Sequence, residues 1–106
     1  MWRRSVEFAD AIFVVADSLP KRYQYSLADQ LRRAALSIPT NIAEGTGRDG
    51  LKERRYFFRV AKGSVYEVVS LLIMSVRRGY VDDHTYGEHY KVANEIAAIL
   101  TALARK

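Results

Sequence analysis

The spacing of apolar residues follows a helical repeat along nearly the whole chain. Between about Ser5 and Ser18, apolar residues recur at steps of three and four, namely Ala9, Ile12, Phe13 and Ala16. This spacing places them on one face of an α-helix, whereas a half-buried strand would alternate apolar and polar residues. Leu19-Pro20 ends the helix, because a residue that precedes proline is disfavoured in helical geometry.

A second helix is predicted from Ser26 to the turn Gly45-Thr46-Gly47. Ser26 and Asp29 resemble a capping box, in which two side chains bond N–H groups of the first helical turn. The apolar face of this helix consists of Leu27, Leu31, Ala35, Ile38 and Ile42. Pro39 lacks a backbone N–H, so we expect a kink or a split near Ser37. At the other end, we expect a glycine in the left-handed conformation to cap the helix.

Two further helices complete the pattern. The third is the longest, from residue 49 or 50 to Arg78, with Gly79 as its C-cap. The fourth begins at Asp82 or Asp83 as N-cap, and its apolar face consists of Tyr86, Tyr90, Ala93, Ala97, Leu100 and Leu103. Four helices joined by short turns in 106 residues predict an all-α, antiparallel up-down four-helix bundle. The length predicts a single domain over residues 1–106.

The third helix carries two contrasting outer segments. Its expected core side consists of Phe57, Ala61, Ser64, Val68 and Leu71. The nearly opposite side begins with a basic stripe, Lys52, Arg55, Arg59 and Lys62, and continues as an apolar patch, Tyr66, Val69 and Ile73. Exposed apolar patches of this kind mark interfaces, so we interpret the patch as a contact with another copy of the chain. The alternative is that an N-terminal arm with Trp2 folds over it.

The excess positive charge is concentrated near this basic stripe. The chain carries 17 Lys and Arg against 12 Asp and Glu, a net charge of +5, and 49% of its residues are apolar. A local surplus of positive charge favours a polyanion or an acidic partner, and the alternative is an ordinary solvated helix face. For nucleic acid, the phosphate-facing candidates are Arg48, Lys52, Arg55, Arg59 and Lys62, with Arg32 and Arg33 as secondary candidates. Such contacts would be salt-sensitive and independent of base sequence.

Catalytic and metal chemistry find little support in the sequence. The chain has no cysteine, and His84 and His89 are five residues apart, which does not place them on one helix face. No nucleophile elbow, phosphate-binding loop or dinucleotide fingerprint is present. We therefore expect a protein that is not an enzyme and has neither metal nor cofactor. No apolar run is long enough for a signal segment or a membrane span, so we expect a cytoplasmic protein without membrane contact.

The polar face of the second helix allows two interpretations. Asn41 and Glu44 could form a small recognition site beside the Gly45 and Gly47 turn. Alternatively, they bond the backbone near Pro39 or pair with arginines of the third helix. We favour the structural interpretation, because a proline leaves a backbone carbonyl without its usual partner.

Residues 30–48, QLRRAALSIPTNIAEGTGR, closely resemble the signature of the 23S rRNA intervening-sequence proteins. Leu19-Pro20, the run Ala61-Lys62-Gly63-Ser64 with Glu67, and Gly79-Tyr80 support the resemblance, which spans nearly the whole chain. The resemblance implies a four-helix bundle that assembles into a ring-shaped homopentamer. The family has no established catalytic residues to carry over, and its name refers to a genomic location inside bacterial 23S rRNA genes. Related pentameric bundles serve diversity-generating retroelements by binding the reverse transcriptase and nucleic acid.

The leading hypothesis from sequence is a non-enzymatic, oligomeric protein that binds the backbone of RNA or DNA through a basic helical face. The contrasting hypothesis is a protein–protein scaffold or accessory adaptor, for example of a reverse transcriptase, that makes no contact with nucleic acid. In that case the charge serves solubility.

Overall fold

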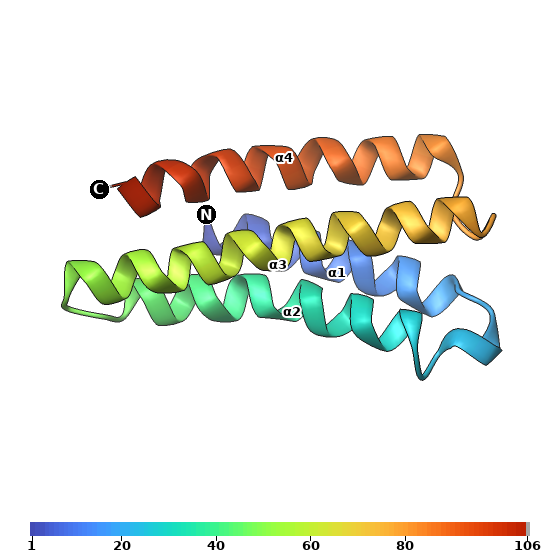
Figure 1. Ribbon diagram of the computed structural model, residues 1–106, viewed down its shortest axis with the longest axis horizontal. Helices are drawn as coiled ribbons and strands as arrows, with labels where there is room; N and C mark the ends of the chain where they lie inside the picture. The colour runs from blue at the N-terminus through green and yellow to red at the C-terminus, as the bar shows by residue number, and fades with distance from the viewer. Residues whose placement is uncertain (106) are drawn as a thin grey trace.

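The computed structural model describes residues 1–105, which form four α-helices and no strand. The helices are α1 (Trp2–Ser18), α2 (Leu27–Thr46), α3 (Leu51–Arg77) and α4 (Asp83–Arg105), and a short 3-10 turn, η1 (Lys21–Tyr23), joins the first two (Figure 1). The expected all-α class with four helices is confirmed. None of these helices combines the length and the apolar character needed to cross a membrane.

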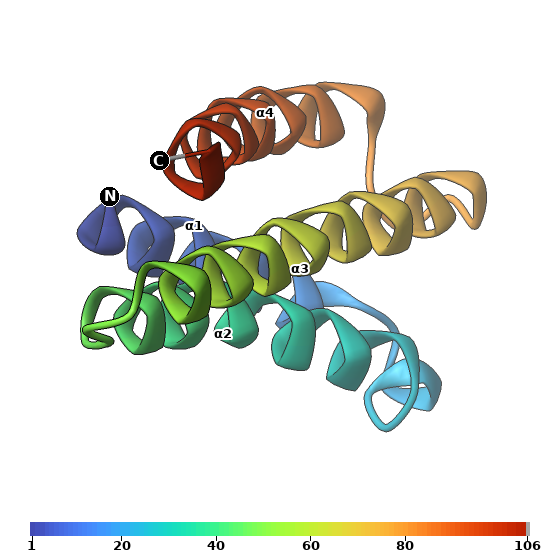
Figure 2. The ribbon, with the colours of Figure 1, turned by 60° about the vertical axis from the view of Figure 1, so that its left-hand side comes forward.

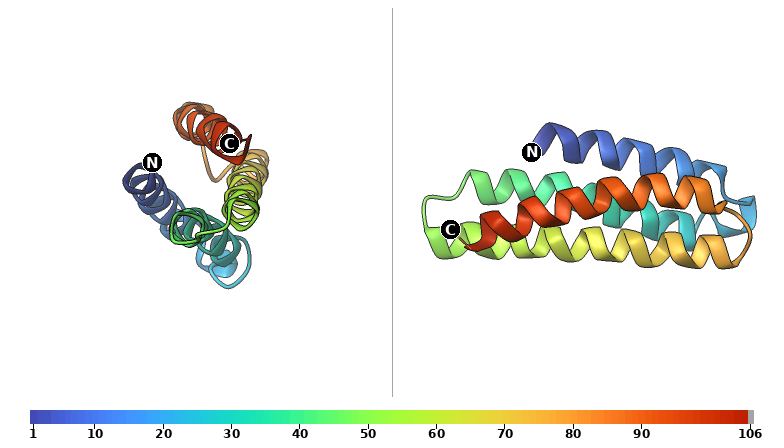
Figure 3. Two further views of the ribbon diagram at one scale, coloured as in Figure 1. Left: turned by 90° about the vertical axis from the view of Figure 1, so that its left-hand side faces the viewer. Right: turned by 90° about the horizontal axis from the view of Figure 1, so that it is seen from above.

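Successive helices pack side by side in an elongated molecule of 43 × 24 × 19 Å. Helix α2 packs against α1 and α3, and α4 packs against α3 (Figure 2). The end-on view shows α1 and α4 as the two ends of an open arc (Figure 3). These two helices contact each other far less than any successive pair does. Helix α3 therefore has neighbours on two sides and an outer surface between them.

One cluster of buried apolar side chains joins all four helices. Its fully buried members include Ile12 of α1, Leu31 and Ile38 of α2, Leu72 of α3 and Ile96 of α4. On each helix, the buried residues recur at helical spacing and so lie on one face. The apolar pattern of the sequence therefore gives helices that pack through that face. The predicted faces of α1 and α2 agree with this core, except that Phe13 and Leu27 are only half-buried.

The core face of α3 differs from the predicted one. Phe58 and Leu72 are buried, whereas the predicted core residues Phe57 and Leu71 are only half-buried. Ala61, Ser64 and Val68 are buried as expected, and Val65 and Ser75 join them. Since adjacent helical residues differ by 100° in direction, two adjacent apolar residues can each satisfy the pattern. Packing against both α2 and α4 selects Phe58 and Leu72.

Helix α2 runs without a break through Pro39. The expected split near Ser37 does not occur, and the ring of Pro39 is buried in the packed interior of the molecule. The capping box is also absent, because Ser26 is the N-cap residue but makes no side-chain capping bond. Asp29 pairs instead with Arg33 one turn later, at 3.0 Å.

The glycines at the helix ends behave differently from each other. Gly47 has φ −81° and does not adopt the left-handed conformation that we expected there. Gly79, by contrast, has φ +79° and follows α3 as predicted. Its N–H donates to the carbonyl of Val76 and the N–H of Tyr80 donates to that of Ser75, each at 2.9 Å. This pair of bonds is the Schellman motif, and it ends α3 sharply.

Candidate nucleic-acid interface

The basic stripe of α3 consists of Lys52, Arg55, Arg59 and Lys62, spaced by three or four residues along one face of the helix. Lys52 and Arg59 are exposed, and Arg55 and Lys62 are half-buried. The Nε atom of Arg55 is enclosed by protein, and the Nζ of Lys62 lies 5.8 Å from the ring centroid of Tyr66. Within residues 1–105, no carboxylate lies within 4.0 Å of the charged groups of Lys52, Arg59 or Lys62. Their positive charge is therefore available to a partner in solution.

Arg48 lies at the turn between α2 and α3, close to the start of the stripe. Its Nη2 donates to Glu44 at 2.7 Å, and its Nε lies 4.0 Å from a carboxylate oxygen of Glu53. Its guanidinium carbon lies 5.0 Å from the ring centroid of Phe57. These contacts hold the side chain in place and compensate part of its charge. A phosphate would have to compete with two carboxylates for Arg48.

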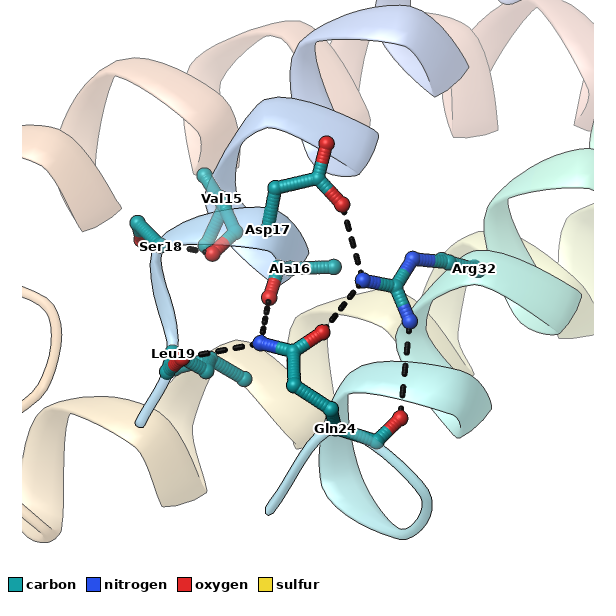
Figure 4. Close-up of polar contacts among 7 residues, drawn as sticks. All are labelled: Val15, Ala16, Asp17, Ser18, Leu19, Gln24 and Arg32. Atoms are coloured by element: carbon teal, nitrogen blue, oxygen red, sulfur yellow. Dashed lines mark hydrogen bonds and ion pairs between the residues drawn. The ribbon is translucent and has the colours of Figure 1, made fainter. Parts of the chain in front are cut away.

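Arg32, one of the two secondary candidates, joins α2 to the end of α1 (Figure 4). Its Nη2 donates to Asp17 at 2.8 Å and to the side-chain oxygen of Gln24 at 2.6 Å. The Nε2 of Gln24 in turn donates to the carbonyls of Ala16, at 3.1 Å, and Leu19, at 2.8 Å. The network satisfies backbone carbonyls at the end of α1 and fixes the segment that carries η1. The guanidinium of Arg32 is thus engaged inside the protein.

Arg33, the other secondary candidate, points into solvent and is not engaged in this way. Its side chain is 80% exposed, and its Nε lies 3.0 Å from the Asp29 carboxylate on the same helix. An exposed ion pair of this kind contributes little to stability and opens readily. Arg33 therefore remains accessible, although it belongs to α2 rather than to the stripe.

Asn41 takes part in a polar network between α2 and α3. Its Nδ2 donates to the carbonyl of Ser37 at 2.8 Å and to the Ser37 hydroxyl at 2.9 Å. The Ser37 hydroxyl bonds that of Ser64 on α3 at 2.8 Å, and Ser64 Oγ donates to the carbonyl of Val60 at 3.2 Å. These contacts, made by residues two positions before and after Pro39, favour the structural interpretation of Asn41. Glu44 does pair with an arginine, but with Arg48 of the turn rather than with α3.

Gly45 is the point at which α2 and α3 approach each other closely. A Cβ atom at Gly45 would lie 2.8 Å from Cε1 of Phe58 and 3.2 Å from the carbonyl oxygen of Arg54. Only a residue without a side chain fits at this distance. The sequence pattern assigned Gly45 to a helix end, whereas its conformation is helical and its role is to admit Phe58. Gly45 follows Ile42 by three residues, about one helical turn, and this spacing was the signal in the sequence that could have indicated its role in helix packing.

The apolar patch of Tyr66, Val69 and Ile73 lies beside α4. Tyr66 is 56% exposed, Ile73 is 44% exposed and Val69 is half-buried. Tyr66 and Val69 line a groove with Tyr90, Ala93, Asn94 and Ala97 of α4, which we call the α3–α4 groove. Tyr90, which the sequence placed on the core face of α4, is 46% exposed and belongs to this surface. Trp2 lies on α1 and is itself exposed, so the patch is bordered by α4 rather than by an N-terminal arm.

Both histidines and several acidic residues lie just before α4 or in its first two turns. Asp82 accepts a bond from the N–H of Thr85 at 2.7 Å, which holds the pKa of its carboxyl below the ordinary value. His84 lies 3.1 Å from Glu88 on the same helix, and burial lowers the pKa of His89. In the part of the chain that the structure describes, no three His, Cys, Asp or Glu side chains gather as a metal site would require.

Comparison with known proteins finds a family to which the chain is similar and a solved structure with the same fold. The sequence model of the family described as "23S rRNA-intervening sequence protein" matches residues 1–102. No curated protein matches the chain. A crystal structure of a protein of unknown function from Bacteroides thetaiotaomicron VPI-5482, described as a member of the S23 ribosomal protein family, superposes with a TM-score of 0.91. The superposition covers 99% of this chain and 98% of that one at 21% sequence identity, so it shows a shared fold.

Proposed function

The chain belongs to the 23S rRNA-intervening sequence protein family, and we propose that it is a non-enzymatic, oligomeric protein that binds the backbone of RNA or DNA. The contact is the basic stripe of α3, Lys52, Arg55, Arg59 and Lys62, with Arg48 at its start and Arg33 of α2 as an additional contact. Arg32 supports the fold rather than the contact, since its guanidinium is engaged by Asp17 and Gln24.

One observation carries this proposal. The stripe places four cationic side chains along one helix face, and among residues 1–105 no carboxylate lies within 4.0 Å of the charged groups of Lys52, Arg59 or Lys62. Elsewhere the arginines Arg4, Arg32, Arg33 and Arg48 each have a carboxylate partner. Uncompensated positive charge at helical spacing attracts a polyanion, and binding releases the counterions condensed on its phosphates.

The proposal extends to the topology and the assembly. We take residues 1–106 as one domain, a cytoplasmic, antiparallel up-down four-helix bundle, in which short turns join helices that pack side by side. We take the assembly to be a homopentamer, as the family resemblance implies, with Tyr66, Val69 and Ile73 in the contact between copies. Exposed aromatic and aliphatic side chains in the α3–α4 groove support such a contact.

A second candidate function rests on the same groove. Its apolar character would equally suit a scaffold or accessory adaptor, for example of a reverse transcriptase, whose partner is a protein and which makes no contact with nucleic acid. The two candidates differ in the residues that they require. Binding of nucleic acid depends on the stripe, whereas a protein adaptor depends on the groove.

A salt-dependent filter-binding titration separates the two candidates. Structured RNA and duplex DNA are titrated with the wild-type protein and with a variant carrying Arg55→Glu and Arg59→Glu. We expect measurable affinity at low salt that falls steeply with added salt, and a loss of at least tenfold, roughly, in the variant. A matched variant, Arg3→Glu with Arg105→Glu, changes the charge equally outside the stripe and should lose much less. Undetectable affinity at low salt, or equal affinity of the two variants, would refute binding through the stripe.

A further inference from the structure

A second cationic site lies at the end of the molecule that carries η1, far along the long axis from the turn between α2 and α3 (Figure 1). There η1 meets the turn between α3 and α4. The Nη2 of Arg22 donates to the hydroxyl of Tyr80 at 2.9 Å, and the Nη2 of Arg78 donates to that of Tyr23 at 3.3 Å. The two tyrosine rings lie 5.4 Å apart between centroids. We call these four residues the Arg–Tyr cluster.

The charge of the Arg–Tyr cluster is not neutralised by acids. Neither Arg22 nor Arg78 has a carboxylate within 4.0 Å among the residues described, 1–105. Lys21 and Arg77 add two exposed positive charges next to them in sequence. The hydrogen bond from Arg78 is the main cause that lowers the pKa of the Tyr23 phenol, as expected of a hydroxyl in a positive surrounding. Gathering like charges in this way is unfavourable in the free protein, and an anion would relieve it.

Both segments that carry the cluster are held rigidly. The Schellman motif at Gly79 fixes the end of α3 and the position of Tyr80. Arg32 and Gln24 tie the chain after η1 to the end of α1 (Figure 4). Each guanidinium uses one bond to a tyrosine and keeps other N–H groups for a ligand. Two pre-positioned guanidinium groups are well suited to the oxygens of a phosphate, because their planar N–H pairs match its geometry.

An exposed aromatic ring lies in the same segment of the chain as Arg22 and Tyr23. Tyr25 follows Tyr23 by two residues and is 97% exposed, the highest value among the large hydrophobic side chains. A phenol ring left almost entirely in water offers both faces to a ligand. Aromatic rings beside arginines are the combination with which proteins hold unpaired nucleic-acid strands, since every base can stack on such a ring. In a duplex, the bases are already stacked and are not available to Tyr25.

We infer that the Arg–Tyr cluster and Tyr25 together bind an unpaired nucleic-acid strand. Arg22 and Arg78 contact backbone phosphates, and Tyr25 stacks on a neighbouring base. The inference rests on the proposed function in that the partner is a nucleic acid, but it uses none of the residues of the basic stripe. A molecule with both sites would hold a duplex segment on α3 and an unpaired segment at the η1 end.

The test is a fluorescence-anisotropy titration of a labelled single-stranded RNA oligonucleotide and of a duplex with the same sequence. The variants are Arg22→Ala with Arg78→Ala, and separately Tyr25→Ala. The matched control is Arg3→Ala with Arg105→Ala, which removes the same charge elsewhere. We expect each of the two test variants to lose about tenfold in affinity for the single strand. For Tyr25→Ala, we expect duplex affinity to stay within about twofold of the wild-type value, since stacking is confined to unpaired bases.

Three results would overturn the inference. The first is that the Arg22→Ala, Arg78→Ala variant binds the single strand as tightly as its control does. The second is that Tyr25→Ala loses as much affinity for the duplex as for the single strand. The third is that a nucleoside monophosphate competes as effectively as the strand itself. Tyr25→Ala removes a ring that is 97% exposed, so it remains decisive even if the arginine variant unfolds. Adding the stripe variant Arg55→Glu with Arg59→Glu keeps the two proposals apart. If that variant alone loses binding, the inference fails and the proposed function stands. If only the cluster variants lose binding, the inference stands and binding through the basic stripe fails.

Discussion

Gly45 decides how closely α2 and α3 approach at the end of the molecule where the basic stripe begins. The ring of Phe58 occupies the space in which a side chain at Gly45 would lie. Gly45 and Gly47 look alike in the sequence, since both flank Thr46 at the end of a helical pattern. The packing of α3 distinguishes them, because Phe58 lies against Gly45 and not against Gly47. A single missing Cβ thus positions the first turns of the stripe.

Substituting Gly45 by Ala tests this close approach. Alanine favours a helix over glycine by about 0.5–1 kcal/mol, yet at Gly45 its Cβ would collide with Phe58 and with the backbone of Arg54. We expect Gly45→Ala to destabilise the fold by about 1–3 kcal/mol, as overpacking does. Gly87→Ala is the matched control, because nothing lies within 4 Å of a Cβ there. It should stabilise by about 0.5–1 kcal/mol. Chemical denaturation measures both, and two changes of the same sign would contradict the account.

Asp82 gives the fold a defined pH dependence. Its pKa in the folded protein lies below the ordinary value of 3.8, because the carboxylate accepts the N–H of Thr85. The unfolded chain therefore takes up this proton at higher pH than the folded one. The stabilisation is complete above pH 3.8 and is lost as the pH falls through the folded-state pKa.

Thermal unfolding of Asp82→Ala and Asp82→Asn measures this contribution. We expect Asp82→Ala to have a lower Tm than the wild-type protein at neutral pH, with a difference that shrinks in acid. Asparagine caps helices as well as aspartate does and does not ionise, so Asp82→Asn should keep most of the stability at neutral pH. A deficit of Asp82→Ala that is the same at neutral and acidic pH would show that the carboxylate is not the cap.

At the scale of the element, the sequence predicted the four helices well and the orientation of α3 less well. Helix lengths follow from the repeat of apolar residues and from its interruption by Pro20, Gly47 and Gly79. The orientation of α3 does not, because Phe57 and Phe58, like Leu71 and Leu72, are adjacent apolar pairs. Either member of a pair continues the helical repeat. The structure selects the second member of each because α2 and α4 pack on two sides of α3.

Alanine substitutions of Leu71 and Leu72 compare the two candidate faces of α3. Leu72 is fully buried, so Leu72→Ala should cost about 2–5 kcal/mol of unfolding free energy. Leu71 is half-buried, so Leu71→Ala should cost less than about 2 kcal/mol. Both values come from urea denaturation at one pH. If Leu71→Ala proved the more costly of the two, the orientation of α3 described above would be wrong.

At the scale of the whole molecule, the sequence indicated where positive charge gathers but not which charges are engaged inside the fold. The basic stripe was evident because its residues lie on one helix. The engagement of Arg32 was not, since its partners Asp17 and Gln24 come from other segments. The Arg–Tyr cluster was missed for the same reason, because Arg22 and Tyr80 are 58 residues apart. Spacing along one helix predicts a surface, but contacts between helices require the fold.

Assembly is predicted to depend on the apolar patch of Tyr66, Val69 and Ile73. Two glutamates in place of Tyr66 and Ile73 would put charge into an apolar contact, so this variant should sediment as a single chain of about 12.1 kDa. The wild-type protein should sediment as a pentamer. Val14→Glu, on the exposed side of α1, is the control and should assemble normally. A wild-type protein that sediments as a monomer at every concentration would contradict the proposed assembly.

The salt dependence of nucleic-acid binding tests the central claim most directly. The logarithm of the affinity for duplex DNA is measured against the logarithm of the salt concentration, for the wild-type protein and for Arg59→Ala with Lys62→Ala. If the basic stripe of α3 contacts phosphates, the slope should become shallower by about 0.9 for each contact removed, and affinity at low salt should fall. An unchanged slope in this variant would contradict binding of nucleic acid through α3.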